Sequence, residues 1–217
     1  RRLKIAALAT IFFRSSHAEV ILDRIHEGYG WEGAHYRPKL DLVSLYIDQT
    51  PEGDLSRERA DRFAQLEIYP TIAKALCLGG DKLAVDGVLI IGEHGTYPET
   101  PDTKQTMYPR RRFFDEIAAC FTRVGKVAPV FNDKHLSYRW DWAKEMADTA
   151  SKLGIPFLAG SSVPLAQRVP PFTLPASAKI TEAVSIHGGG IESYDFHALE
   201  VLQSIVEFRK GGETGIA

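Results

Sequence analysis

Short apolar runs alternate with segments of helical periodicity along the first part of the chain. Runs at residues 4–10, 40–48 and 85–92 have the length and the continuous hydrophobicity of buried strands. Amphipathic segments separate them, and the clearest covers residues 140–153 and ends at Gly154. Strands that alternate with helices at this spacing indicate βαβ units in a parallel sheet.

The other expected elements continue the same alternation. The complete set is strands at 4–10, 40–48, 85–92, 127–131 and 155–159, and helices at 17–25, 55–65, 70–78, 113–124 and 140–153. Right-handed crossovers would arrange these elements as an α/β fold, a Rossmann-type doubly wound parallel sheet. We expect its ligands to bind outside the carboxyl ends of the strands.

The pattern changes after the last of these strands. Several prolines within residues 163–175 predict an extended connector, followed by a strand at 179–187 and a helix at 192–208. One strand and one helix bury too little surface for a core. We therefore expect a Rossmann-like domain at 1–160 and a connector with part of a C-terminal α+β domain at 161–217, which implies either a longer protein or a missing half supplied elsewhere.

Composition narrows the function classes. The 217 residues are 44% hydrophobic, and the net charge is −2 from 26 basic and 28 acidic residues, which argues against a nucleic-acid surface. No stretch approaches the ~20 apolar residues of a membrane span. A cytoplasmic location is the default expectation, and a removed leader is left open. Cys77 and Cys120 lack CxxC spacing and are expected to be buried thiols.

A lysine follows the fourth expected strand in the sequence APVFNDKHL at residues 128–136. Together with ERADRFA at 58–64, DGVLII at 86–91 and GGIESYDFHALE at 189–200, in this order and spacing, it resembles the glucose–fructose oxidoreductase and inositol dehydrogenase (Gfo/Idh/MocA) family. This resemblance implies an N-terminal Rossmann domain and a C-terminal α/β domain built on an open sheet. It also implies NAD or NADP as cofactor, and the open sheet favours a homo-oligomer.

The resemblance implies an NAD(P)-dependent oxidoreductase acting on a sugar or polyol-like substrate. Lys134 stands at the family's lysine between nicotinamide and substrate, Asp133 at the acid before it, and His197 at the family's C-terminal histidine. These three are the expected catalytic residues, because a lysine or histidine can take the proton of an alcohol. Glu200 matches an acid that often follows the histidine.

The first turn departs from the family because its glycine motif is lost. Ala9, Ile11 and Arg14 occupy the glycine positions, and Ile11 is expected to place a branched side chain where the phosphates sit. Arg14 is either an anion ligand or a solvated cation, and Asp48 is either a ribose ligand or a turn residue. The expected cofactor positions are Thr10, Ile11, Arg14, Asp48 and Gly92.

Two other readings stay open. The first is a non-redox enzyme that uses acid–base or metal-assisted chemistry on a carbohydrate. It would use the polar residues that follow two strands, Glu93, His94, Asp133 and His135. No metal-binding spacing is present, and no metal ligand is assigned. The second is a non-catalytic binding module. Arginines at 110–112 offer a sugar-acid or phosphate site, or a solvated helix start. Aromatic side chains offer stacking for a sugar or simply core packing; they are Tyr97, Tyr108 and Trp140.

Overall fold

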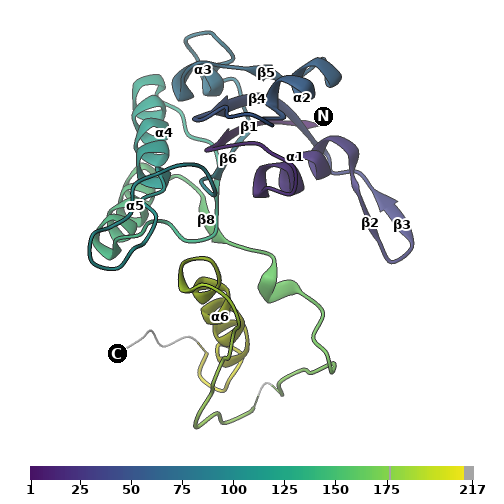
Figure 1. The fold of residues 1–217 in the computed structure, drawn as a ribbon, viewed down its shortest axis with the longest axis vertical. Coiled ribbons are helices and arrows are strands. Elements are labelled where there is room, and N and C mark those ends of the chain that lie inside the picture. Colours follow the sequence, from purple (N-terminus) through teal and green to yellow (C-terminus); the bar gives the residue numbers. More distant parts are fainter. Residues whose placement is uncertain (176, 213–217) are drawn as a thin grey trace. The chain divides into compact units, whose positions relative to one another are not determined.

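The computed structural model describes residues 1–175 and 177–212. Six strands form one sheet in the order β5-β4-β1-β6-β7-β8 (Figure 1). Their bounds are β1 Leu3–Ala9, β4 Leu40–Ile47, β5 Glu67–Ile68, β6 Gly87–Ile91, β7 Val130–Asp133 and β8 Phe157–Gly160. β1 pairs in parallel with both β4 and β6, and the β4–β5 and β6–β7 pairs are also parallel. This strand order confirms the predicted Rossmann-type doubly wound α/β class.

Side chains of β1 alternate between two hydrophobic layers, one on each face of the sheet. Ala6 and Leu8 pack in the layer that contains side chains of α3, α4 and α5. Ala7 and Ala9 pack in the layer that contains side chains of α1. The helix bounds are α1 His17–Glu27, α2 Ser56–Arg62, α3 Ile72–Cys77, α4 Arg110–Val124 and α5 Trp140–Leu153. A central strand buried on both faces explains why its sequence is continuously apolar.

Most element boundaries follow the sequence pattern. α5 has the expected bounds and ends at Gly154, whose φ of +67° suits glycine. α4 begins at Arg110, three residues earlier than expected, which brings this arginine into the helix. The hairpin of β2 (Tyr29–Trp31) and β3 (Ala34–Tyr36) was not expected. No helix in the described part of the chain is long and apolar enough to cross a membrane.

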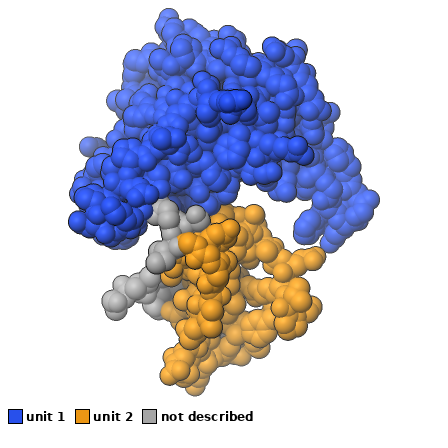
Figure 2. All heavy atoms as spheres, in the orientation of Figure 1, with its two compact units in different colours: residues 1–159 blue, residues 160–217 orange. Residues whose placement is uncertain are grey.

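The chain divides into two compact units, residues 1–159 and 160–217 (Figure 2). The first unit holds the sheet. The second contains a short 3₁₀ turn, η1 (Val163–Leu165), and the helix α6 (Ile191–Val206).

The expected strand at 179–187 is wrong. These residues form no regular secondary structure, and Val184 and Ile186 are 81% and 93% exposed. Among the described residues, no strand pairs with this segment, and an unpaired strand is not stable.

Both cysteines are buried free thiols, as expected. The Sγ atoms of Cys77 in α3 and Cys120 in α4 lie 3.9 Å apart. Burial raises the pKa of the Cys120 thiol, because a thiolate is poorly solvated there.

His26 makes the stability of the first unit depend on pH. The buried ring stacks on Phe63 at 3.9 Å, and neither ring nitrogen has a hydrogen-bond partner among the described residues. Burial lowers the pKa of His26, so the unfolded chain binds this proton more readily than the folded chain.

We predict that the free energy of unfolding falls as the pH drops below about 6.5, by up to about 1.4 kcal/mol per pH unit from this histidine. His26→Phe should keep the stack on Phe63 and flatten the pH dependence, measured by urea denaturation between pH 7 and 5. The exposed His35 gives the matched control, His35→Phe. Equal slopes for both variants and the wild type would contradict this role of His26.

Candidate functional site

Polar side chains gather where β1, β6 and β7 end. Thr10 follows β1, Glu93 and His94 follow β6, and Lys134 and His135 follow β7. The Thr10 hydroxyl donates to the backbone carbonyl of Glu93 at 2.7 Å and ties the first two loops together. The strand order reverses between β1 and β6, and doubly wound sheets bind ligands at such a point. This edge of the sheet, formed by the carboxyl ends of β1, β6 and β7, is called the crevice below.

Glu93 is the centre of a buried ion-pair network. Lys134 Nζ donates to Oε1 at 2.8 Å, and Arg110 Nη2 donates to Oε2 at 2.6 Å. Lys134 is only 5% exposed and Arg110 only 1%. The Lys134 backbone has a φ of +62°, a left-handed conformation that is uncommon without glycine. Strand end, ion pair and backbone conformation together fix the direction of the lysine side chain.

The charges of this network support one another. Burial alone would raise the pKa of Glu93, but Arg110, Lys134 and His17 outweigh it and the pKa is lowered. Glu93 is therefore a carboxylate at neutral pH, and it compensates two cations that would otherwise be costly to bury.

A second hydrogen-bonded pair lies beside this network. Nδ1 of His17, the first residue of α1, lies 2.7 Å from Oδ2 of Asp133 at the end of β7. The His17 ring also meets the ring of His94 edge-on at 5.6 Å, and burial lowers the pKa of His94. His17 is not among the site residues expected from the sequence. The available signal was a histidine at a helix start that faces the strand ends.

Three of the four residues proposed as a metal edge are hydrogen-bonded to other side chains. The four residues are Glu93, His94, Asp133 and His135. Glu93 accepts from two cations, Asp133 pairs with His17, and Nε2 of His135 lies 2.9 Å from Arg110 Nη1. Among the described residues, no group of three or more His, Cys, Asp or Glu side chains is placed to hold a metal ion.

The turn after β1 does not fit the pyrophosphate of a dinucleotide held in the usual pose. Ile11, which stands at one of the lost glycine positions, is buried, with 8% of its surface exposed. The obstacle is the start of α1, where Ser16 Oγ accepts from the Glu19 amide at 3.2 Å and the Glu19 carboxylate accepts from the Ser15 amide. The Glu19 carboxylate, which also pairs with Arg59 at 3.4 Å, thus places a negative charge in the first turn of α1, where it disfavours a bound anion. Arg14 is exposed.

Asp48 has three hydrogen-bonding partners within the first unit. Tyr46 and Tyr97 donate their hydroxyls to its two oxygens at 2.7 and 2.8 Å, and Arg112 pairs with it. Burial opposes ionisation of Asp48, but these three partners lower its pKa.

Gly92 has a packing role beside the crevice. A Cβ atom built on it would lie 2.5 Å from Cγ of Arg110. Glycine at this position lets the arginine pass close to the backbone and reach Glu93.

The expected catalytic histidine lies in the second unit. Nδ1 of His197 is 3.0 Å from Oε2 of Glu200, and the Ser161 amide donates to Oε1 of the same carboxylate at 2.8 Å. Glu200 thus ties α6 to the start of the connector.

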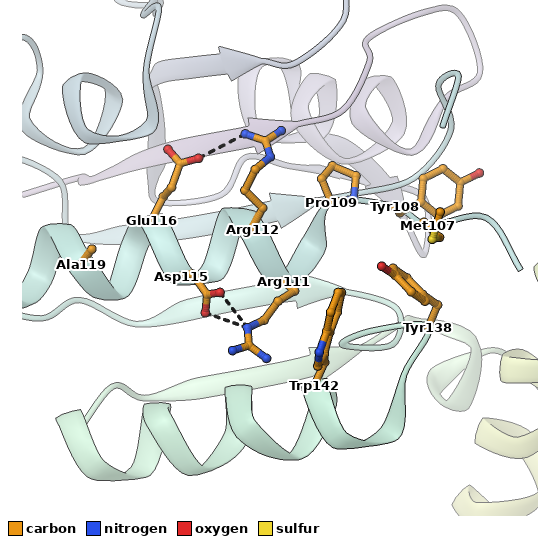
Figure 3. A pocket seen from close by; sticks show the side chains of 10 residues that line it. All are labelled: Met107, Tyr108, Pro109, Arg111, Arg112, Asp115, Glu116, Ala119, Tyr138 and Trp142. Atoms are coloured by element: carbon orange, nitrogen blue, oxygen red, sulfur yellow. Dashed lines mark hydrogen bonds and ion pairs between the residues drawn. The ribbon is translucent and has the colours of Figure 1, made fainter. Parts of the chain in front are cut away.

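The arginines at 110–112 all have carboxylate partners within the first unit. Arg111 pairs with Asp115 and Glu145, and Arg112 with Asp48 and Glu116. Figure 3 shows the open groove of about 650 Å³ beside them. It is lined by Met107, Tyr108, Pro109, Arg111, Arg112, Asp115, Glu116, Ala119, Tyr138 and Trp142. These internal pairs leave the arginines less suited to an anionic ligand than the sequence implied.

We predict that Glu93→Gln lowers the free energy of unfolding by about 3–5 kcal/mol, because it leaves two buried cations uncompensated. Urea denaturation measures this loss. Glu116→Gln removes one partner of a half-exposed pair with Arg112 and should cost no more than about 1 kcal/mol. Similar losses for the two variants would mean that the Glu93 network contributes no more than a surface pair.

No family model and no curated protein matches the chain. It is similar to a solved Gfo/Idh/MocA family oxidoreductase from Vibrio cholerae (20% identity, TM-score 0.46, covering 75% of this chain and 39% of that one). It is also similar to myo-inositol 2-dehydrogenase from Lactobacillus plantarum (12% identity, TM-score 0.47, covering 74% of this chain and 36% of that one). A third similar structure is an NAD binding oxidoreductase from Klebsiella pneumoniae (18% identity, TM-score 0.46, covering 76% of this chain and 35% of that one). The chain spans well under half the length of these proteins. The matched structures include members of the family that the sequence resembles.

Proposed function

We propose that this chain carries the reaction site of an oxidoreductase that acts on a hydroxyl-bearing carbon of a sugar or polyol-like substrate with NAD or NADP. The observation that carries the proposal is the buried ammonium of Lys134, held at the carboxyl end of β7 by Glu93. A buried cation in a ligand-binding crevice is costly to maintain, which favours a functional role over a purely structural one. In the family that the sequence resembles, the lysine at this position lies between nicotinamide and substrate.

Lys134 is suited to bind and orient a substrate oxygen. An ammonium carries three hydrogen-bond donors, and Glu93 is the one side-chain acceptor that the described residues give it. Thr10 and Arg110 hold the carboxylate in place through its backbone and its second oxygen. The nicotinamide cofactor would bind in a pose in which its pyrophosphate does not contact the turn between β1 and α1.

A non-redox enzyme on the same crevice is the second candidate. It rests on the start of α1, where the Glu19 amide donates to Ser16 Oγ and the Ser15 amide donates to the Glu19 carboxylate. Such an enzyme would use the same acid–base groups on a carbohydrate without a dinucleotide.

Cofactor titration separates the two candidates. We expect calorimetry to detect binding of NAD⁺, NADH, NADP⁺ or NADPH with a dissociation constant below the millimolar range. If none of the four binds at millimolar concentration, the redox proposal fails and the second candidate is favoured.

Lys134→Met tests directly whether the Lys134 ammonium binds and orients the substrate oxygen. In a panel of hexoses, pentitols and cyclitols with either cofactor, we expect this variant to lose about 10²–10⁴ in turnover. Lys144→Met, which removes an exposed lysine paired with Asp148, should retain the wild-type rate. Thermal melting of both variants controls for folding. A folded Lys134→Met protein with full turnover would contradict the proposed role.

A further inference from the structure

We infer that the His17–Asp133 pair is the proton-accepting group of the crevice, and that Lys134 serves as a fixed cation beside it. The inference rests on the proposed function only in taking the crevice as the place of reaction. It applies to the redox and the non-redox candidates alike, because both need a group that takes a proton from a hydroxyl.

The geometry of the pair orients the imidazole for this task. An ionised carboxylate only accepts hydrogen bonds, so the 2.7 Å contact with Asp133 places the proton of the neutral ring on Nδ1 of His17. Nε2 is then an acceptor, and no described residue hydrogen-bonds to it. The same division of roles, in which a buried acid holds a histidine in one tautomer, operates in hydrolase triads.

The two residues of the pair differ in their exposure to solvent. Asp133 is 4% exposed, whereas the His17 side chain is 31% exposed. The Asp133 carboxylate holds Nδ1 of His17, and its negative charge would stabilise the imidazolium that forms when His17 takes a proton. Asp133 is therefore a positioning residue, and His17 is the group that would touch the substrate.

The other titratable side chains of the crevice are less suited to accept a proton. Glu93 is an acceptor for two buried cations, and Lys134 is one of them. Nε2 of His135 accepts from Arg110. His94 is half-buried, and burial disfavours its charged form. His17 combines exposure, an unoccupied acceptor nitrogen and a carboxylate to compensate the charge.

The proton transfer is a simple exchange of bonds. The O–H bond of a substrate hydroxyl breaks, an N–H bond forms at Nε2 of His17, and the electron pair stays on the oxygen. Lys134 directly follows Asp133 in the chain, and its positive charge would favour the oxygen anion.

The tautomer of His17 can be measured without any substrate. We expect ¹⁵N-edited NMR of the full chain at neutral pH to show the Nδ1–H tautomer for His17, and Asp133→Asn to shift it toward Nε2–H. An Nε2–H tautomer in the wild type, or no change in Asp133→Asn, would overturn the inference.

Two substitutions test the reactive nitrogen in the same sugar and polyol panel. His17→Asn keeps a donor near the Nδ1 position and removes Nε2, so turnover should fall by about 10²–10⁴ with little change in KM. Asp133→Asn should lower turnover less and change its pH profile. His35→Asn, at an exposed histidine of β3, should match the wild type.

Wild-type turnover in a folded His17→Asn protein would overturn the inference even if the tautomer is as expected. If the wild type turns over no compound in the panel, the proposed function fails, and the tautomer measurement alone decides whether the pair stands.

Discussion

The carboxylate of Glu93 is the constraint on which the crevice depends. It lies at the end of β6 and accepts hydrogen bonds from Lys134 after β7 and from Arg110 at the start of α4. One buried acid thereby connects two strand ends and a helix. Without it, two cations would be left uncompensated in a site of low dielectric constant. The left-handed backbone of Lys134 and the glycine at position 92 both serve this arrangement.

Around this network the site differs from a glycine-turn dinucleotide site in a consistent way. Ser16 accepts from the Glu19 amide at the start of α1, and Asp48 has three hydrogen-bonding partners within the protein. The strand ends instead gather groups that handle protons and charge. The sheet and its helices match the Rossmann-type arrangement, whereas the turn after β1 lacks the glycine motif. The fold and the cofactor therefore need separate tests.

The sequence predicted the sheet well because its signal is local. Strands buried on both faces are continuously apolar, and the helix at 140–153 is bounded by its own periodicity and by Gly154. The site was predicted only as a set of residues near strand ends. Its pairings join residues far apart in the chain, such as His17 with Asp133, and no local pattern encodes such contacts. The strand expected at 179–187 failed for the same reason, because a strand needs a partner that periodicity does not reveal.

A buried, ion-paired lysine follows β7 at the carboxyl ends of the strands of this sheet. Direct NMR detection of lysine ammonium groups in ¹⁵N-labelled protein tests this arrangement most directly, with Lys134→Arg to assign the signal. The account predicts one ammonium resonance protected from exchange with water, lost in Lys134→Arg and exposed to rapid exchange when Glu93 is neutralised. A Lys134 signal that exchanges as fast as those of the exposed lysines would contradict it.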